Sequence, residues 1–173
     1  YDESKRLGET FCYIFNTYHN VHTNIIRPFN VYGPGMKQND YRIFPNFISN
    51  ILNKKELKIY GSGNQTRTYC YVTDAIEGFL RVMALGKSGS AYNIGNNKPE
   101  ISVKHIIKIF QKIHKNRIKS KVVEYPKSYP DDEPLRRCPD LTKAKKDLNY
   151  YPKTDLETGL SNYMEWAKNN YNF

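Results

Sequence analysis

The 173-residue sequence predicts an α/β layered fold, because helix-like and strand-like segments alternate along it. Apolar residues recur every three or four positions in the helical segments, and they form short runs rich in β-branched and aromatic residues in the strands. Glycine-containing turns end several of these runs, as at Gly33-Pro34-Gly35 and at Gly95. The sequence contains no repeats and no low-complexity linkers, and its length allows one domain or at most two.

The predicted elements follow one another closely. In chain order we expect a helix over 2–20, a buried strand over 24–32, a helix over 44–53, a short strand over 57–60, a strand over 68–72, a helix to about residue 85, a strand over 91–94, a helix from residue 103, a strand over 121–125, and helices over 141–148 and 156–169. Thr73 or Asp74 is expected to cap the third helix, and Ser102 the fourth. The fourth helix has His105 where a capping box has Glu or Gln, so its cap is partial.

One glycine pattern needs to be distinguished from a cofactor motif. Gly61-Ser62-Gly63 is a G-x-G pattern, but it follows a short strand and leads through Arg67 into another strand. A dinucleotide-binding fingerprint leads from a first strand into a helix. We therefore reject it as such a fingerprint, and no G-x-G-x-x-G follows a first strand in this sequence.

The composition excludes several classes of protein. With 39% hydrophobic residues, 15 Tyr and 8 Phe, the chain is not intrinsically disordered, and no apolar run is long enough for a membrane span. Cys12, Cys70 and Cys138 are odd in number and form no C-x-x-C pair, which indicates free thiols in a reducing compartment and a cytoplasmic protein. The four histidines have no metal-ligand spacing, so we expect no metal site.

The net charge of +10 comes mostly from one segment. Residues 104–121 contain six Lys, one Arg and no acidic residue, and Lys104, Lys108 and Lys112 are spaced along one helix face. Such a face could bind nucleic acid or an anionic membrane. However, Lys outnumbers Arg 19 to 8 in the chain, and no aromatic residue lies on this lysine face to stack on bases. We interpret the segment as an amphipathic helix with a solvated face, and expect neither nucleic acid nor membrane as a partner.

Tyr1 and Lys5 form a Y-x-x-x-K pattern on the first predicted helix. The i, i+4 spacing places the phenol and the ammonium on one face. A free Tyr has a pKa of about 10, and a fixed cation beside it favours the phenolate. The pair therefore suits removal of a proton from a sugar or alcohol hydroxyl, although the pattern alone is common.

Further motifs accompany this pair over nearly the whole chain. They are Tyr1–Arg6 with Glu9-Thr10, Arg27–Pro34, Asn39–Arg42 with Asn46–Ile48, Tyr60–Arg67, Tyr71–Asp74, Tyr92–Asn96 and Arg136–Ala144. Together they resemble the extended short-chain dehydrogenase/reductases of the NAD-dependent epimerase/dehydratase family. Within that family the opening and the 39–48 segment are most similar to UDP-glucuronate decarboxylases, whereas Pro28, Val31 and Glu133-Pro134-Leu135 depart from the decarboxylase pattern.

The resemblance implies that the chain is the C-terminal part of such an enzyme. Residues 1–35 would be the end of the Rossmann domain, and residues 36–173 mainly the smaller sugar-nucleotide-binding domain, with one Rossmann strand and helix returning around 68–95. The family's Gly-rich NAD loop and its acid/base residues lie upstream of the Tyr. The chain opens without Met inside a helix, so we expect it to be cut from a longer protein and to be inactive alone.

The resemblance also implies roles for individual residues at the cofactor. Tyr1 would be the catalytic base, Lys5 would bind the nicotinamide ribose, and Pro28 would lie against the nicotinamide of NAD. An ordinary exposed helix terminus is the alternative for Tyr1 and Lys5.

On the substrate side, the resemblance implies that Asn30, Arg42 and Arg67 bind the sugar diphosphate. Asn30 could instead cap the following turn, and the two arginines could form surface salt bridges. Tyr60 would pack on the nucleotide base, with a core Tyr as the alternative. One of Arg136 and Arg137 should reach the diphosphate, and we favour Arg137.

These roles imply conversion of UDP-glucuronate to UDP-xylose through a 4-keto sugar, with NAD regenerated in each cycle. A nucleotide-sugar 4,6-dehydratase or 4-epimerase is the alternative, and a nucleotide-sugar-binding scaffold is the non-catalytic one. The expected partner is a UDP-sugar or another nucleotide-sugar, and we expect the full-length enzyme to be a homodimer.

Overall fold

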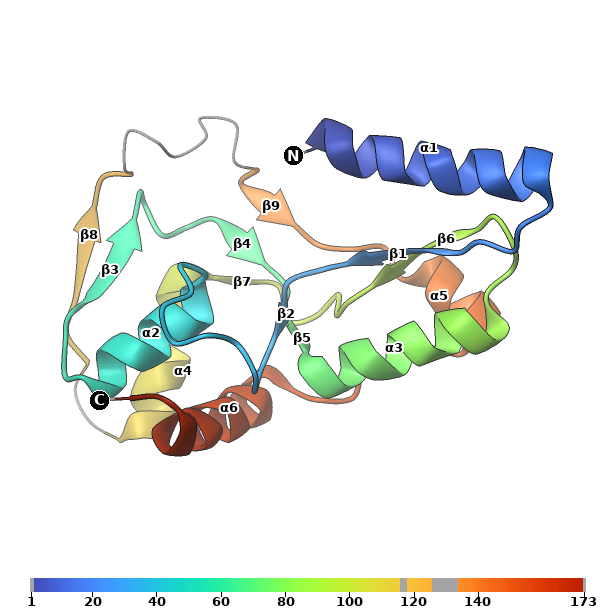
Figure 1. Cartoon of the computed structure of the whole chain (residues 1–173). Coiled ribbons are helices and arrows are strands. Elements are labelled where there is room, and N and C mark those ends of the chain that lie inside the picture. Colours follow the sequence, from blue (N-terminus) through green and yellow to red (C-terminus); the bar gives the residue numbers. More distant parts are fainter. Residues whose placement is uncertain (1, 116–117, 126–133, 173) are drawn as a thin grey trace.

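The computed structural model describes residues 2–115, 118–125 and 134–172, and it confirms the predicted α/β class (Figure 1). Helices alternate with single strands or groups of strands along most of the chain, which ends on two successive helices. In chain order they are α1 (Asp2–His19), β1 (Ile25–Pro28), β2 (Val31–Tyr32), α2 (Ile43–Leu52), β3 (Leu57–Tyr60), β4 (Thr66–Arg67), β5 (Cys70–Tyr71), α3 (Val72–Leu85), β6 (Ala91–Ile94), β7 (Ile101–Ser102), α4 (Val103–His114), β8 (Ser120–Val123), β9 (Arg136–Arg137), α5 (Thr142–Leu148) and α6 (Leu156–Asn170).

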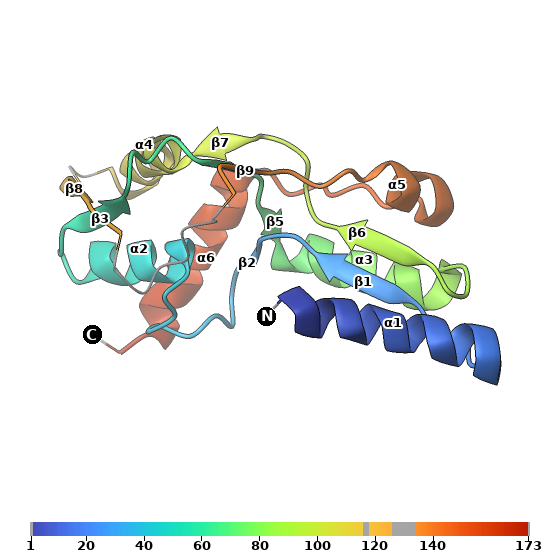
Figure 2. The ribbon, with the colours of Figure 1, turned by 90° about the horizontal axis from the view of Figure 1, so that it is seen from above.

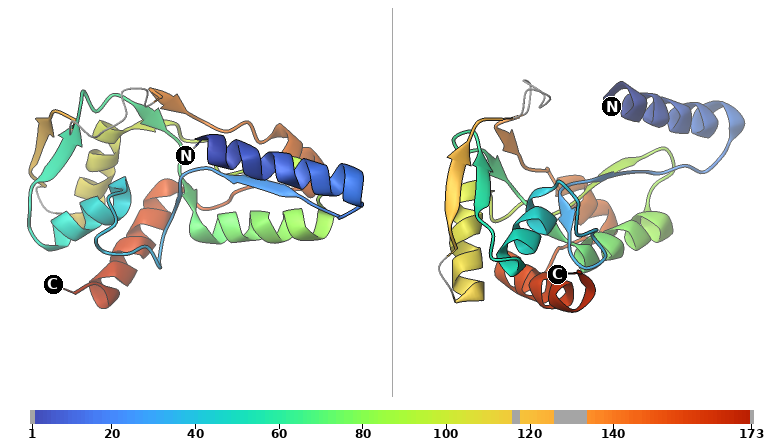
Figure 3. Two further views of the ribbon diagram at one scale, coloured as in Figure 1. Left: turned by 45° about the horizontal axis from the view of Figure 1, so that its top comes forward. Right: turned by 60° about the vertical axis from the view of Figure 1, so that its left-hand side comes forward.

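The strands pair in small sheets, and most of the pairs are parallel. β1 pairs with β6, β2 with β5 and β3 with β8, all in parallel. β4 lies between β7, which is antiparallel to it, and β9, which is parallel. Parallel pairing of strands far apart in sequence requires crossover connections. The connection between β2 and β5 contains α2, and the connection between β3 and β8 contains α3 and α4. In Figures 1 and 3, α1 and α3 lie on opposite sides of the β1–β6 pair.

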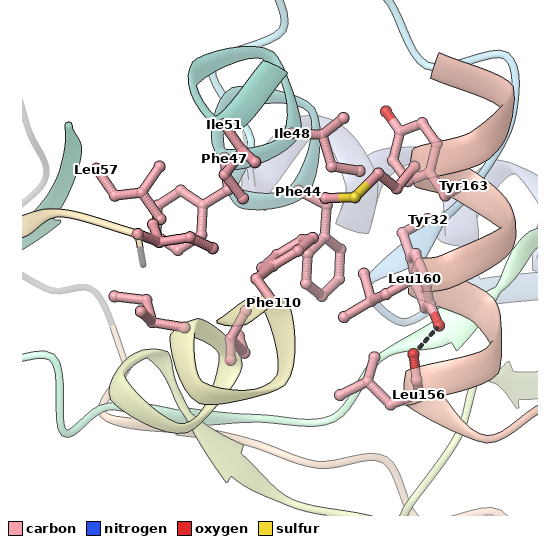
Figure 4. Packing of buried hydrophobic residues seen from close by; sticks show 14 of the residues in the cluster. Tyr32, Phe44, Phe47, Ile48, Ile51, Leu57, Phe110, Leu156, Leu160 and Tyr163 are labelled. Carbon is pink, nitrogen blue, oxygen red and sulfur yellow. Dashed lines mark hydrogen bonds between the residues drawn. The ribbon is translucent and has the colours of Figure 1, made fainter. Parts of the chain in front are cut away.

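The larger hydrophobic cluster lies between α2, α4 and α6 (Figure 4). Phe44 and Ile48 from α2, Phe110 from α4 and Leu160 from α6 are at most 2% exposed. Tyr32 joins them from β2, with its ring centroid 4.7 Å from that of Phe44 and its hydroxyl 3.5 Å from the Leu156 carbonyl oxygen. This cluster therefore fastens the end of β2 to the three helices.

A second, smaller cluster lies between β6, α3 and α5. Its fully buried members include Tyr92, Ile94, Leu141 and Tyr150. The Tyr150 hydroxyl donates to the Gly95 carbonyl at 2.9 Å, which ties the segment after α5 to the end of β6. The helices and strands therefore pack around two separate hydrophobic clusters. The domain boundary at residue 35 stays a prediction.

The helix α1 is attached at the side of the β1–β6 pair by polar contacts. None of its described residues is buried. Arg27 forms an ion pair with Glu9 through two hydrogen bonds, one of them from Nε at 2.7 Å, and the Thr23 hydroxyl donates to the Cys12 carbonyl at 2.9 Å. Its exposed aromatic and aliphatic side chains are Leu7, Phe11, Tyr13, Phe15 and Tyr18.

The strand predicted over 24–32 is wrong in two respects. It is split into β1 and β2, and its residues are mostly half-buried or exposed rather than buried. The break lies at Phe29-Asn30, where Asn30 adopts a left-handed conformation with φ of +45°. Asn tolerates this conformation better than most residues. The predicted strand over 68–72 is shortened to β5, because Thr68 and Tyr69 lie outside the strands and Val72 already begins α3.

The predicted helix caps have mixed outcomes. The Ser102 hydroxyl accepts the His105 backbone N–H at 3.3 Å, which confirms the cap of α4. Neither Thr73 nor Asp74 caps α3, because that helix already begins at Val72. Asp74 is buried in the first turn instead, where its carboxylate accepts the Thr154 backbone N–H at 2.9 Å. The two-residue strands β7 and β9 were not predicted, since two residues carry no periodicity.

Two helical glycines provide a matched test of this packing. A Cβ at Gly78 of α3 would lie 2.5 Å from Ile94 and 2.9 Å from Tyr150, whereas a Cβ at Gly8 of α1 would have nothing within 4 Å. Overpacking costs about 1–3 kcal/mol, and replacing Gly by Ala in a helix gains about 1 kcal/mol. Gly78→Ala should therefore lower the free energy of unfolding in urea titrations, and Gly8→Ala should raise it. Equal stabilisation by both would contradict the described packing of α3.

Candidate functional site

The carboxyl ends of β1 and β6 lie side by side, since Pro28 pairs with Ile94 at the end of the parallel register. Ligands of open α/β sheets bind beyond this edge, where the loops after the strands diverge. Here the loops carry Phe29-Asn30 and Gly95-Asn96. Figures 1 and 2 show the first turn of α1 directed toward the same edge.

Lys5 is held near this edge by its own helix. It lies one turn before Glu9, which is paired with Arg27, the neighbour of Pro28. The hydrogen bonds from Arg27 lower the pKa of the Glu9 carboxyl, so the pair stays ionised at neutral pH. Lys5 and Pro28 are both exposed. Tyr1 lies outside the described residues, so its predicted role and the helix-terminus alternative both stay open.

Asn30 connects the loop after β1 to the segment between β4 and β5. Its side-chain Nδ2 donates to the Thr68 carbonyl at 2.8 Å, and its own carbonyl accepts the Cys70 N–H at 3.1 Å. Thr68 is fully buried, and among the described residues its hydroxyl oxygen has no hydrogen-bond partner. The Asn30 amide is thus engaged across two segments rather than in a cap of the following turn.

The strand register places two of the predicted arginines next to each other. Arg67 of β4 pairs with Arg137 of the parallel strand β9, and the Thr68 N–H donates to the Arg137 carbonyl at 3.2 Å. Paired residues on neighbouring strands have their side chains on the same face of the sheet. Arg67 is only 8% exposed and donates from Nη1 to the Thr66 carbonyl at 2.8 Å and from Nη2 to the Pro134 carbonyl at 2.6 Å. The surface position expected in the alternative for Arg67 is therefore wrong.

Arg136 points to the opposite face of the same sheet. Its guanidinium binds the Glu100 carboxylate through Nε at 2.9 and 3.0 Å and through Nη2 at 2.8 Å. The Thr66 hydroxyl donates to the same carboxylate at 2.6 Å. Hydrogen bonds from Thr66 and then from Arg136 lower the pKa of Glu100. Of the two neighbouring arginines, Arg137 is the one on the face of Arg67.

Arg42 lies in a different place. Its Nε donates to both carboxylate oxygens of Asp40 at 3.0 Å, and this contact lowers the pKa of the Asp40 carboxyl. Both residues line a shallow groove of about 540 Å³ between the Gly33–Lys37 loop and Val72. Arg67 and Arg137 do not line this groove. Arg42 thus forms the salt bridge named as its alternative, and its diphosphate role stays a prediction.

Tyr60 forms an aromatic pair at the ends of β3 and β8. Its ring stacks on Tyr125 with a centroid distance of 6.0 Å and an angle of 22°. Gln65 donates to the Tyr125 hydroxyl at 3.1 Å. Tyr60 is 39% exposed, so the alternative of a core tyrosine is wrong, and its stacking on a base stays a prediction.

Sequence reasoning missed Glu100, Gln65 and Thr68 as parts of this region. Glu100 and Thr68 are placed by pairing with strands distant in sequence, which no local pattern reveals. Gln65 lies inside the Tyr60–Arg67 motif, so the motif itself was a signal for it.

The described part of the chain offers neither a nucleophilic thiol at Cys70, nor a metal-binding group, nor a membrane-spanning helix. Burial raises the pKa of the Cys70 thiol to about 11, so this thiol is not a nucleophile at neutral pH. Within the described residues, no three His, Cys, Asp or Glu side chains form a group that could hold a metal ion. None of the described helices has the length and apolar character needed to cross a bilayer.

Among curated proteins, this chain is similar to UDP-glucuronic acid decarboxylases. UDP-glucuronic acid decarboxylase 6 of Arabidopsis thaliana is 38% identical over 160 residues, which are 92% of this chain and 45% of that protein. UDP-glucuronic acid decarboxylase 1 of Xenopus tropicalis is 37% identical over 97% of this chain and 38% of its own length. The chain therefore spans less than half the length of these relatives.

Solved structures share the fold over almost the whole chain. UDP-glucuronic acid 4-epimerase from Bacillus cereus, in complex with UDP-glucuronic acid and NAD, superposes with a TM-score of 0.84 at 31% identity, over 95% of this chain and 51% of that one. A dTDP-glucose 4,6-dehydratase from Streptomyces venezuelae superposes with a TM-score of 0.82 at 24% identity, over 94% and 48%. The latter similarity shows the fold alone.

A family model provides the remaining comparison. The model of the NAD dependent epimerase/dehydratase family matches residues 1–95, which is more than half of the sequence and includes α1, the split strand 25–32 and the Tyr60–Arg67 segment. Together with the extended Rossmann-type fold and the edge formed by β1 and β6, this match means that the chain belongs to the NAD dependent epimerase/dehydratase family.

Proposed function

We propose that the natural protein containing this chain decarboxylates UDP-glucuronate to UDP-xylose, with NAD as its cofactor. The similarity to UDP-glucuronic acid decarboxylases, at 37–38% identity over more than nine-tenths of the chain, supports this substrate and reaction. The structural observation that carries the proposal is the pairing of Arg67 with Arg137 on one sheet face.

Two arginine residues that share one face of a sheet suit a nucleoside diphosphate. Each can donate two parallel hydrogen bonds to phosphate oxygens, and two adjacent phosphates require more than one such donor. Asn30 adds an amide to the same region through its bond to Thr68, the residue after Arg67. Arg67, Arg137 and Asn30 would therefore bind the diphosphate, and the exposed face of Tyr60 would pack on the base.

The residues near the strand edge fit the nicotinamide end of NAD. Lys5 offers an exposed ammonium, and Pro28 offers an exposed apolar surface at the end of β1. When bound, NAD supplies an acceptor and donor of hydride for the sugar C4 carbon. Tyr1 would remove the proton from the C4 hydroxyl, and Lys5 would favour the phenolate.

A UDP-glucuronate 4-epimerase is the second candidate. The solved 4-epimerase from Bacillus cereus is 31% identical to this chain over 95% of its length. Epimerisation and decarboxylation would share substrate, cofactor and the roles of Tyr1 and Lys5. The products distinguish the two functions.

The reaction is tested by incubating the natural protein with UDP-glucuronate and NAD. We expect release of CO2 and formation of UDP-xylose, observed by mass spectrometry. Tyr1→Phe should lower turnover at least about a hundredfold while leaving UDP binding nearly unchanged, because only the ionisable oxygen is removed. An isomer of unchanged mass would identify an epimerase, and loss of water from a neutral sugar nucleotide would identify a dehydratase.

The diphosphate site is tested with two neighbouring substitutions. Arg137→Ala should weaken UDP binding by about 1.5–3 kcal/mol, since a charged hydrogen-bonding group is lost. Arg136→Ala should weaken it less, because the Arg136 guanidinium is bound to Glu100 on the other face. Isothermal titration with UDP measures both. A larger loss for Arg136→Ala would mean that Arg136, not Arg137, is the ligand.

We also propose that the natural protein is a cytoplasmic homodimer. The free thiols Cys12, Cys70 and Cys138 are typical of a reducing compartment. A stripe of apolar side chains runs along α1 at helical spacing, and its members Leu7, Phe11, Phe15 and Tyr18 are 47–72% exposed. Contiguous apolar surface of this kind marks an interaction site.

Sedimentation of the natural protein tests the dimer. Phe11→Glu should shift the equilibrium toward monomer, because a charge would be buried without a partner. Tyr41→Glu is the control, since Tyr41 is 92% exposed and lies outside α1. A monomeric wild-type protein would contradict the proposal.

A further inference from the structure

The Glu100 side chain links all three strands of the β7-β4-β9 sheet. Glu100 immediately precedes β7, which pairs with β4. Its carboxylate accepts one hydrogen bond from Thr66 of β4 at 2.6 Å and three from Arg136 of β9 at 2.8–3.0 Å. No other described carboxylate binds two strands of this sheet at once.

The two residues that Glu100 holds are register partners. Thr66 pairs with Arg136, and the next residues, Arg67 and Arg137, pair with each other on the opposite face. A contact that fixes Thr66 against Arg136 therefore also fixes the separation of the Arg67 and Arg137 backbones. Glu100 binds the Thr66 and Arg136 side chains on one face of the sheet. This binding sets the positions of Arg67 and Arg137 on the other face.

The other described contacts of β9 are mainly with β4, and the hydrogen bond from Arg67 Nη2 to the Pro134 carbonyl just before β9 is one of them. The strand β9 has two residues, and its ladder with β4 includes the Thr66 N–H to Leu135 carbonyl bond at 2.9 Å and the Thr68 N–H to Arg137 carbonyl bond at 3.2 Å. Short exposed pairings of this kind open locally at low free energy. The Arg136 and Glu100 side chains are 66% and 27% exposed, so their ion pair adds little to global stability. The contact between Glu100 and Arg136 therefore aligns β9 against β4 locally and contributes little to the free energy of unfolding of the whole fold.

We propose that Glu100 is a positioning residue for the diphosphate site, holding β9 against β4 so that Arg137 lies beside Arg67. This inference rests on the proposed nucleotide-sugar function for its ligand, but the alignment itself concerns only the protein. Glu100 touches no substrate in this proposal and acts through Arg136 and Thr66. The hydrogen bonds that lower its pKa keep the carboxylate ionised at neutral pH.

Hydrogen exchange tests the alignment without any ligand. In the full natural protein, Glu100→Ala should speed exchange of the Thr68 amide, whose acceptor is the Arg137 carbonyl. Glu77→Ala is the matched control, because it removes another Glu–Arg pair, with Arg81 on α3, outside this sheet. Unchanged exchange at Thr68 in Glu100→Ala, measured by NMR, would overturn the proposed alignment.

Binding of UDP tests the consequence for the site. Glu100→Ala should raise the Kd for UDP about fivefold to tenfold in the wild-type background and leave it unchanged when Arg137 is already Ala. Glu100→Gln, which can still accept the Thr66 hydroxyl, should lie in between. Glu77→Ala should have no effect in either background.

The outcomes separate the two proposals. A wild-type protein that does not bind UDP would overturn the proposed function and with it the diphosphate role. A wild-type protein that binds UDP, with equal losses from Glu100→Ala in both backgrounds, would overturn the positioning role alone, because a purely structural effect does not depend on Arg137.

Discussion

The hydrogen bond from the Asn30 side chain to the Thr68 carbonyl joins the segment between β1 and β2 to the segment between β4 and β5. Both hydrophobic clusters are connected through this point. On one side, Asn30 follows β1, which belongs to the β1–β6 pair above the smaller hydrophobic cluster. On the other side, it precedes β2, whose Tyr32 is buried in the larger cluster. Thr68 similarly lies between β4 and β5. The two crossing segments thus connect both hydrophobic clusters at one point, and a left-handed Asn is what allows the chain to turn there.

The arginines show how the same side chain acquires different uses from its surroundings. Arg27 and Arg42 are each bound to a nearby carboxylate, and the first fixes α1 while the second closes a loop beside the groove. Arg136 is bound by Glu100, whereas Arg67 donates to backbone carbonyls from a buried position beside Arg137. Only the last arrangement brings two guanidinium-bearing residues together on one sheet face. The proposed diphosphate site rests on this arrangement.

The helix α1 contributes to the site without contributing much to the core. Its polar contacts to β1 and to the segment before it orient the first turn toward the strand edge, but no described residue of the helix is buried. Its apolar stripe, and the exposed Ile76, Leu80 and Met83 of α3, leave both sides of the β1–β6 pair with apolar surface. By contrast, the residues of the larger cluster that Figure 4 labels are all buried, because α2, α4 and α6 cover one another's apolar faces.

Local patterns in the sequence were enough to predict the α/β class, the positions of the helices and the family. Helical periodicity is local, so α1, α2, α5 and α6 begin and end within a few residues of their predicted positions. The helix α4 begins at the predicted residue 103, and its Ser102 cap is correct. The predicted site residues Lys5, Pro28, Asn30 and Arg67 were found through motifs rather than through geometry. Their roles in binding stay predictions.

The features that depend on pairing between distant segments became visible only in the folded chain, because no local pattern specifies such pairing. The tertiary structure broke the first predicted strand at 29–30 and shortened the strand predicted over 68–72 to Cys70–Tyr71. It replaced the predicted cap of α3 by a buried Asp74 and bound Arg42 to Asp40. It also separated Arg136 from Arg137, because alternate residues of a strand point to opposite faces and only the register with β4 shows which face holds Arg67. A two-residue strand such as β9 has no periodicity of its own, so its face is fixed by its neighbours β4 and Glu100 and not by its sequence.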